Sequence, residues 1–382
     1  MIYLDNAATT YPKPPDVHRA VADALIHYGA NPGRGGYHMA MATTERIFAC
    51  REKLASLFHL ENPAGVVFTA NCTGALNIVI KGILSNGGHA IVTDMEHNSV
   101  IRPLTALANR GVTYTTIAVD PWNPTETAAR VRMAIRPTTR LILCTHASNV
   151  LGLRTPISVI GSVAEKAGIP FAVDAAQSAG ILPIDMKSDK IDYLCLPGHK
   201  GLYGPMGVGV LLCRGERLLS TVMEGGTGSQ SLRLSQPEEL PDRFESGTLN
   251  VPAICGLLGG LEWIERNGGV SQLAQREVTL MKAFYSRLAT LSHIHIYTPY
   301  PELAVTVPIV TFNVEGLESE ETARRLNKHG VAVRAGLHCA PSAHRKIGTV
   351  TTGAVRICPS AFTTCADLEK VGKILTEITR IP

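Results

Sequence analysis

Two side chains able to carry chemistry follow neighbouring apolar runs in the middle of the chain. Asp174 comes directly after residues 170–173, and Lys200 follows residues 191–196 and a short Pro-Gly-His turn. An isolated Asp in such a place is more often a helix cap, and an isolated Lys is usually solvated. The glycine-rich segment 201–209, however, excludes bulk and lets a flat ligand approach the backbone. The pair therefore predicts a ligand site.

An amine and a carboxylate at the ends of two strands suit one kind of covalent chemistry. A lysine that forms a Schiff base must be able to lose its proton, which a desolvated strand end favours. A pyridine ring that acts as an electron sink needs a carboxylate facing its ring nitrogen. If both runs are strands of one sheet, Asp174 and Lys200 address the same ring. The nearby glycines match neither a Walker motif nor a dinucleotide fingerprint, so they do not argue for ATP or NAD.

The elements that must position this pair alternate regularly in the first two thirds of the chain. Short apolar runs predict seven strands, at residues 65–69, 89–93, 112–117, 141–145, 170–173, 191–196 and 207–213. Helical patterns lie between most of them, for example at residues 17–28 and 155–167. This alternation predicts a mostly parallel sheet covered by helices, with ligands beyond the carboxyl ends of the strands.

The last third of the chain has a different, mixed order of elements. A long helical stretch is expected over residues 251–290, and it is followed by strands and helices in the order expected for an α+β unit. Those elements are residues 293–297, 309–314, 318–329, 331–335, 354–358 and 364–379. We therefore expect an α/β fold with a large domain at 15–262 and a smaller C-terminal domain at 263–382, on which an N-terminal arm at 1–14 packs.

Three segments resemble the fold-type I, class V enzymes that use pyridoxal 5′-phosphate (PLP), and within them the cysteine desulfurases and selenocysteine lyases. The segments are DAAQ at 174–177, GHKGLYGP at 198–205 and RAGLHCA at 334–340. The similarity extends from YLDNAATT at 3–10 to VR at 355–356. Together these segments are far more specific than any one of them.

The resemblance assigns roles around the cofactor ring. It implies that Lys200 carries PLP as a Schiff base and that Asp174 faces the pyridinium nitrogen. Gln177 would bond the ring hydroxyl oxygen, and His97 would stack on the ring. Asn149 would lie near both the ring oxygen and the substrate carboxylate. Without the resemblance, His97 would more often be a structural histidine.

The phosphate needs hydrogen-bond donors at the start of a helix. Residues 69–77 follow a strand and open a helix, so their N–H groups and the Thr73 hydroxyl suit an anion, although an ordinary N-cap explains them equally well. The resemblance adds phosphate contacts from Cys72, His199, Gly247 and Thr248. The last two resemble the segment that reaches a partner subunit's phosphate, which implies a homodimer.

The resemblance also assigns the groups that would meet an amino-acid substrate. Arg356 and Arg334 are expected at the ends of neighbouring strands, with Arg356 as the carboxylate clamp, because an Arg fork binds a carboxylate bidentately. Cys339 lies in a loop rich in Gly, His and Arg, whereas several other cysteines lie in apolar runs. Adjacent cations favour a thiolate, and the resemblance makes Cys339 the nucleophile that accepts sulfur.

The function implied is that of a PLP-dependent cysteine desulfurase, which converts L-cysteine to L-alanine and leaves a persulfide on Cys339 for a sulfur-acceptor protein or a reductant. Selenocysteine lyase is an alternative with nearly the same residues. Another class V reaction, transamination or epimerisation, needs Lys200 and Asp174 but no thiol. A catalytically idle sulfur-transfer or scaffold protein is a third alternative, but both residues whose loss would mark it are present.

Three positions depart from the common desulfurase pattern. Pro197 stands where many relatives carry a hydroxyl residue, Cys72 where Thr is frequent, and Leu337 where His is frequent. The substrate and the strength of cofactor binding are therefore left open by the sequence.

Composition limits the partners and the compartment. Lys and Arg number 36 against 32 Asp and Glu, which gives no electrostatic reason to expect nucleic acid or an acidic membrane. Nine cysteines without a CxxC pair favour neither a disulfide framework nor a paired-cysteine zinc site, so no metal is predicted. The chain shows no signal-peptide pattern and no apolar stretch near the roughly 20 residues of a membrane span. We expect a cytoplasmic protein.

Overall fold

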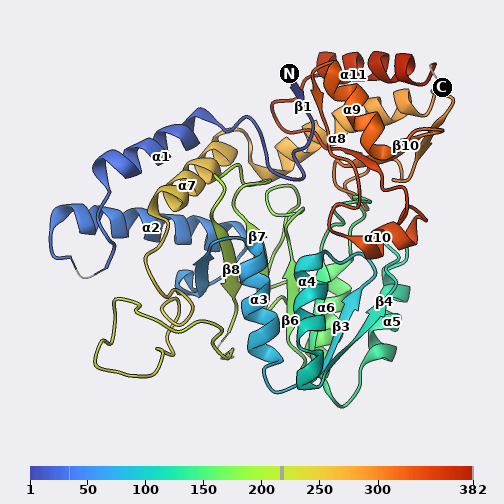
Figure 1. Cartoon of the computed structure of the whole chain (residues 1–382). Helices are drawn as coiled ribbons and strands as arrows, with labels where there is room; N and C mark the ends of the chain where they lie inside the picture. The colour runs from blue at the N-terminus through green and yellow to red at the C-terminus, as the bar shows by residue number, and fades with distance from the viewer. Residues whose placement is uncertain (34, 216–218, 381–382) are drawn as a thin grey trace.

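The computed structural model describes residues 1–33, 35–215 and 219–380, and its larger lobe is built on a seven-stranded sheet (Figure 1). The strands are β2 (Val66–Thr69), β3 (Gly88–Thr93), β4 (Val112–Ile117), β5 (Thr139–Thr145), β6 (Phe171–Asp174), β7 (Tyr193–Pro197) and β8 (Gly209–Cys213). Their order is β2-β8-β7-β6-β5-β3-β4, and only β8 runs antiparallel to its neighbours. The prediction of a mostly parallel seven-stranded sheet is confirmed.

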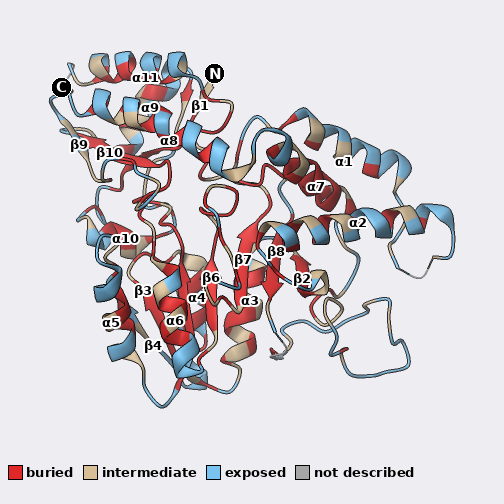
Figure 2. Ribbon diagram, turned by 180° about the vertical axis from the view of Figure 1, so that it is seen from behind, coloured by how far each residue is buried: buried red, intermediate tan, exposed pale blue. Residues whose placement is uncertain are grey.

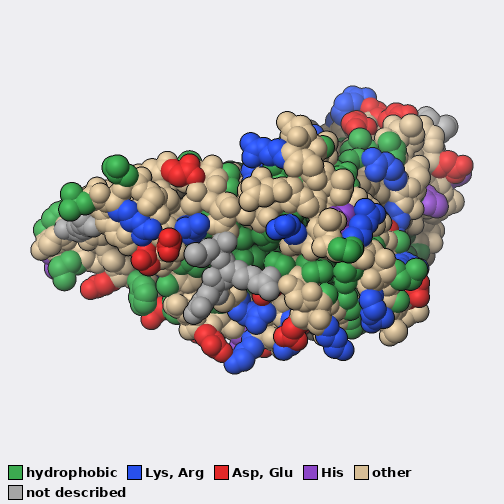
Figure 3. Space-filling view, turned by 90° about the horizontal axis from the view of Figure 1, so that it is seen from below, with side chains coloured by type: hydrophobic (Ala, Val, Ile, Leu, Met, Phe, Trp, Pro, Cys, Tyr) green, Lys and Arg blue, Asp and Glu red, His purple; other side chains and the backbone are tan. Residues whose placement is uncertain are grey.

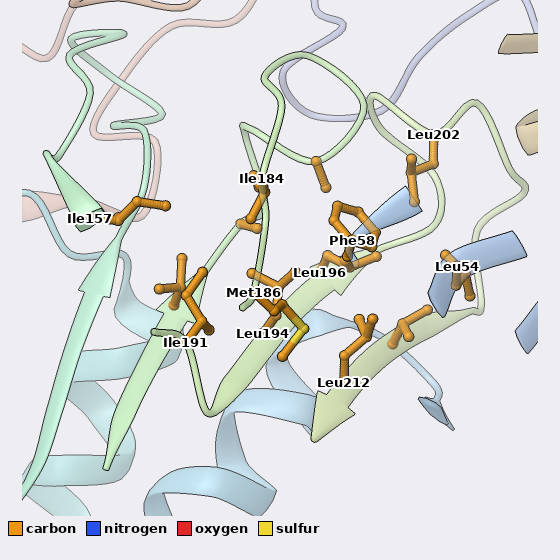
Figure 4. Close-up of a cluster of buried hydrophobic side chains, with 14 of the residues drawn as sticks. Leu54, Phe58, Ile157, Ile184, Met186, Ile191, Leu194, Leu196, Leu202 and Leu212 are labelled. Carbon is orange, nitrogen blue, oxygen red and sulfur yellow. The ribbon is translucent and has the colours of Figure 1, made fainter. Parts of the chain in front are cut away.

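Helices cover both faces of this sheet, which is why its strands are apolar almost throughout. Along β5, Leu141 and Leu143 face one apolar cluster while Ile142 and Cys144 face another. The first cluster includes α3 (Cys72–Ile83) and α4 (Asn98–Ala106); the second includes α1 (Pro15–His27), α2 (His38–Leu57), α5 (Pro124–Ala134), α6 (Ile157–Ala167) and α7 (Val251–Arg266). Figure 2 shows the buried sheet between helices with exposed outer faces, and Figure 4 shows part of the second cluster.

The smaller lobe is an antiparallel sheet packed against helices. Its strands are β9 (Ile294–Ile296), β10 (Val310–Val314) and β12 (Val355–Ile357), in the order β12-β10-β9. Its helices are α8 (Gly269–Leu288), α9 (Ser319–Lys328) and α11 (Cys365–Ile378), whereas the short α10 (Pro341–Lys346) buries Ala343 in the core of the larger lobe. Two short 3-10 helices, η1 (Pro63–Gly65) and η2 (Ala108–Arg110), complete the elements of the larger lobe.

The single helical stretch expected over residues 251–290 is wrong, because the chain turns between α7 and α8. Gly268 and Gly269 adopt φ values of 89° and 78°, a left-handed conformation that glycine adopts without steric cost. The first part of the stretch packs in the core of the larger lobe, and most of the second part packs in the smaller one. The domain division at residue 262 stays a prediction.

The N-terminal arm joins the two lobes. Strand β1 (Ile2–Tyr3) pairs in parallel with β11 (Val331–Ala332), and Leu4 is buried in the core of the smaller lobe. Further along, the carbonyl of Ala7 and the backbone N–H of Thr10 bond to the larger lobe beyond β6 and β7. No described helix combines the length and apolar character required to cross a membrane.

Candidate active site

A cavity of about 130 Å³ opens beyond the carboxyl ends of β5, β6 and β7. We call it the front cavity. Lys200 and Asp174 both line it, so the amine and the carboxylate predicted from the sequence share one space. Eight of the predicted residues line this cavity: Cys72, Thr73, His97, Asn149, Asp174, Gln177, His199 and Lys200.

The carboxylate and the amine are both poorly solvated. Asp174 ends β6 and is 2% exposed, and burial raises the pKa of its carboxyl although the Ala176 N–H, 2.9 Å from Oδ1, and the charge of Lys200 act in the opposite sense. Burial, followed by the charge of Arg356, lowers the pKa of Lys200. The lysine is therefore readily neutral, and the carboxylate would be stabilised by a cation in the cavity.

Cys72 contacts the carboxylate at the start of α3. Its thiol lies 3.7 Å from Asp174 Oδ1 and donates to it. Burial, with Asp174 as the next cause, raises the pKa of Cys72, so the group remains an S–H donor. The Asn71 side chain caps the same helix by accepting from the Gly74 N–H at 2.9 Å. The phosphate contact expected from Cys72 stays a prediction; its side chain interacts with the carboxylate.

His97 is held as a neutral imidazole at the start of α4. The Ser99 N–H donates to its Nδ1 at 3.0 Å, so the ring proton lies on Nε2. Burial, followed by the charge of Lys200, lowers the pKa of His97 to about 4. Ser99 Oγ also lies 2.8 Å from Thr73 Oγ1, which links the starts of α3 and α4.

The front cavity also contains a buried histidine nitrogen without a protein partner. His199 Nδ1 is buried and makes no hydrogen bond within the described part of the chain, and burial lowers the pKa of this imidazole to about 4. The His199 carbonyl accepts from the Thr10 N–H at 3.1 Å and from Lys13 Nζ at 2.7 Å, so the arm holds this residue in place. An unpartnered buried nitrogen beside a helix N-terminus fits an anionic phosphate group.

Two of the predicted phosphate contacts lie away from this cavity. Thr248 lines a separate cavity of about 480 Å³ with Thr69 and Gly74, on the chain around the start of α3. Gly247 has φ 92° and donates its N–H to the Gly226 carbonyl at 2.8 Å. Within one chain these residues do not reach the front cavity, and their contact with a partner's phosphate stays a prediction.

The loop that carries Cys339 is tied to the rim of the cavity by its backbone. Asn149 Nδ2 donates to the His338 carbonyl at 2.7 Å, and the Asn98 N–H donates to the Cys339 carbonyl at 2.8 Å. Both loop residues are left-handed, with φ values of 49° and 58°. The Cys339 side chain is exposed and follows this fixed backbone at the start of α4, beside His97.

The two arginines do not lie where the sequence predicted. Arg356 is in the middle of β12 instead of at its end, and β11 ends at Ala332, so Arg334 meets Arg356 only through an isolated bridge. Arg356 is 2% exposed: Nη2 donates to Asp5 Oδ1 at 3.0 Å and Nη1 to the Asn149 carbonyl at 2.9 Å. Its Nε has no partner in the described ranges. Arg334 is exposed.

A family model for class-V aminotransferases matches residues 2–371. The chain belongs to this family. It is 32% identical to a probable cysteine desulfurase of Methanothermobacter thermautotrophicus, covering 99% of this chain and 94% of that protein. A cysteine desulfurase of Klebsiella pneumoniae is also 32% identical, over 89% of this chain and 84% of its own length.

Two solved structures of cysteine desulfurases have the same fold. The apo cysteine desulfurase from Thermococcus onnurineus superposes with a TM-score of 0.91 at 30% identity, covering 99% of this chain and 94% of the other. A cysteine desulfurase from Escherichia coli superposes with a TM-score of 0.87 at 26% identity, covering 99% of this chain and 94% of the other. The family and fold expected from the sequence are confirmed.

Sequence reasoning gave no role to several residues that build this class-V site. Asp5, Thr10 and Lys13 of the arm hold Arg356 and His199, and Ser99 fixes the His97 tautomer. The segment YLDNAATT could have indicated this supporting role. It resembles the family, yet none of its residues suits cofactor chemistry, so the resemblance must have another cause. In the described ranges, no group of three or more His, Cys, Asp and Glu could hold a metal ion.

Proposed function

We propose that this chain is a PLP-dependent cysteine desulfurase that converts L-cysteine to L-alanine and leaves a persulfide on Cys339. The observation that carries the proposal is that Lys200 and Asp174, from the ends of successive strands, line one cavity. An amine and a carboxylate in one space are what a Schiff-base cofactor with a protonated ring nitrogen requires. The exposed Cys339 at the rim supports a sulfur-accepting step.

The residues present fit PLP. Asp174 would hold the proton of the ring nitrogen, and the cation would stabilise the buried carboxylate. Neutral His97 would stack on the ring, and His199 Nδ1 with the start of α3 would hold the phosphate. When bound, PLP supplies an electron sink for negative charge at the Cα of an attached amino acid.

Lys200 and Arg356 would act on the substrate. With its pKa lowered, the Lys200 amine is available as the base that removes the Cα proton. Arg356 would bind the substrate carboxylate; Asp5 and the Asn149 carbonyl keep two of its nitrogens in place, and its Nε is unpartnered. A fixed carboxylate orients the Cα–H bond toward the base.

Cys339 would take the sulfur. Its thiolate attacks the substrate sulfur, the new S–S bond forms as the C–S bond breaks, and the electron pair of that bond stays on the carbon that becomes alanine. The sulfur left on Cys339 stays accessible because this side chain is exposed. A sulfur-acceptor protein or a reductant would then remove it.

We also propose a homodimer in the cytoplasm. Large apolar side chains are exposed where α1 ends and α2 begins: Leu25, Ile26, Tyr37, Met39 and Met41. Figure 3 shows several separate apolar side chains exposed at one end of the molecule. An exposed apolar patch of this kind favours a protein interface. Thr248 at the margin of a separate cavity is compatible with a phosphate contact in a partner. All nine cysteines are free thiols, as in reducing compartments.

Two variants test the proposal. Lys200→Ala should abolish the absorbance of the Schiff base with PLP, because among the described residues Lys200 is the lysine that shares the cavity with Asp174. Cys339→Ala should keep that absorbance and release no sulfide from L-cysteine. If Cys339→Ala forms alanine and sulfide at the parent rate, the thiol is not the acceptor, and a class V reaction without a nucleophilic thiol becomes the better proposal. Parallel assays with L-selenocysteine would separate desulfurase from lyase.

A further inference from the structure

A second, smaller cavity shares Lys200 with the front cavity. Its volume is about 30 Å³, and we call it the rear cavity. Lys200, Ala176 and Gln177 line both cavities, whereas Glu277 of α8 and Cys358 after β12 line only the rear one. A space of this size holds about one water molecule, and Glu277, Lys200 and Gln177 offer it polar partners in an otherwise largely apolar lining. The lysine thus has a route to a second polar group that does not pass through the cofactor space.

Glu277 is a buried carboxyl group without a cation. It is 2% exposed, and no Lys or Arg of the described residues forms a salt bridge with it. Burial raises the pKa of this carboxyl to about 8, so it is a neutral acid near neutral pH. A buried Glu without an ion pair is uncommon and costs stability unless it is protonated or hydrogen-bonded.

The hydrogen bonds of Tyr203 decide where the acid proton lies. The Tyr203 hydroxyl accepts from the Ala361 N–H at 3.0 Å and donates its own proton to Glu277 Oε1 at 3.1 Å. The proton of the carboxylic acid is then on Oε2. Within the described part of the chain, no protein acceptor bonds to Oε2. A water molecule in the rear cavity would satisfy this donor.

We propose that Glu277 stores a proton for Lys200 and exchanges it through a water molecule in the rear cavity. The inference rests on the proposed role of Lys200 as the base at Cα. As the O–H bond of Glu277 breaks, the water accepts that proton and passes one of its own to Lys200 Nζ, leaving a carboxylate and an ammonium. The Tyr203 hydroxyl stabilises the carboxylate, and the reverse transfer restores the neutral amine. The transfer involves no oxidation or reduction.

The other titratable groups around Glu277 do not compete for this proton. They come from three elements: Tyr203 from the loop after β7, Cys358 from the chain after β12, and Arg276 from α8 itself. Burial raises the pKa of both Tyr203 and Cys358, so each stays protonated near neutral pH. Arg276 is exposed, and an arginine side chain does not give up its proton in proteins. Of these groups and Lys200, Glu277 and Lys200 are the pair that exchanges a proton.

The test is the exchange of the Cα proton of L-alanine with D₂O, catalysed by the full-length, PLP-loaded protein. This exchange needs Lys200 but no thiol. Glu277→Gln keeps an acceptor for Tyr203 but has no proton to store, so exchange should slow at least about tenfold. Alanine binding, followed by absorbance, should be unchanged. The parent's rate should titrate near pH 8 and that of the variant should not. Glu315→Gln, an exposed glutamate of the smaller lobe, is the matched control.

Two further measurements separate a proton store from a structural role. Cys358→Val puts a bulkier apolar side chain in the wall of the rear cavity and so leaves less room for the water molecule. Exchange of the alanine proton should therefore slow although Glu277 remains in place. The infrared difference between the cofactor-free parent and Glu277→Gln should contain a protonated-carboxyl band that disappears as pH rises past 8; the buried Glu96 carboxyl, with a similar pKa, is common to both spectra and cancels.

The experiments distinguish a failure of the proposed PLP function from a failure of the proposed proton store at Glu277. If the parent protein forms no Schiff base with PLP, the proposed function is wrong. If it does, and both Glu277→Gln and Cys358→Val exchange the alanine proton at the parent rate, the stored proton is wrong while the proposed function stands.

Discussion

The two walls of the front cavity hold their side chains in different ways. On the wall made by strand and helix ends, the Asp174 carboxylate and the His97 imidazole are each fixed by a backbone N–H two residues further along the chain. On the other wall, the Cys339 loop is fixed by its backbone carbonyls, while the thiol itself is exposed. The difference suits a division of work: cofactor chemistry needs fixed groups, and a group that hands sulfur to an acceptor must reach solvent.

The difference between the two walls is tested most directly by substituting one residue of each wall in turn. Asp174→Ala should lower the exchange of the alanine Cα proton at least about 100-fold, because the ring nitrogen loses the carboxylate that keeps it protonated. Cys339→Ser should leave that exchange within about twofold of the parent and release no sulfide. Deuterium exchange measured by NMR and a sulfide assay distinguish the two. Loss of exchange in Cys339→Ser would contradict the division.

The two arginines extend the comparison to the substrate. Arg356→Gln should raise the KM for L-cysteine about 10- to 100-fold, the effect of losing a charged hydrogen bond worth about 1.5–3 kcal/mol. Arg334→Gln, at an exposed position, should change KM less. Because Arg356 also bonds Asp5, thermal unfolding of both variants is the control for a folding defect. Equal KM values would remove Arg356 from the clamp.

The strand wall should also have a pH signature. Glu96 ends the turn after β3 and accepts from Thr93 and Thr145, and burial raises the pKa of its carboxyl to about 8. The folded pKa exceeds the unfolded one of 4.5, so the stability contributed is complete below pH 4.5 and is lost as pH rises through about 8. Between these values the free energy of unfolding should fall by up to about 1.4 kcal/mol per pH unit. Glu96→Gln should remove this share of the slope, whereas Glu277, whose pKa burial also raises to about 8, keeps its own share. A slope equal to that of the parent would contradict the assignment to Glu96.

The smallest effect is expected where a single hydrogen bond joins the walls. Asn149→Ala removes the donor to the His338 carbonyl, worth about 1 kcal/mol, so sulfide release should slow about fivefold. The exchange of the alanine proton should change less than sulfide release. If exchange falls more, Asn149 acts mainly on the cofactor, and its bond to the loop is secondary.

Much of the fold was predictable because local patterns carry it. All seven strands of the large sheet appear within a few residues of their predicted limits, since apolar runs between helical patterns describe a sheet buried on both faces. The helix expected at residues 17–28 is α1, opened by a proline at its first position. Asp174 and Lys200 were predictable for the same reason, because parallel strands end at one edge of the sheet.

The sequence by itself determined the alternation of elements, the amine and carboxylate at neighbouring strand ends, and the loop position of Cys339. These are properties of short segments, set by apolar periodicity and turn chemistry. Only the tertiary structure decided that Asp5 holds Arg356, that Glu277 comes near Lys200, and that Gly247 and Thr248 lie outside the front cavity of their own chain. Each of these depends on packing between residues far apart in the chain, and burial rather than residue type sets the protonation of the groups involved.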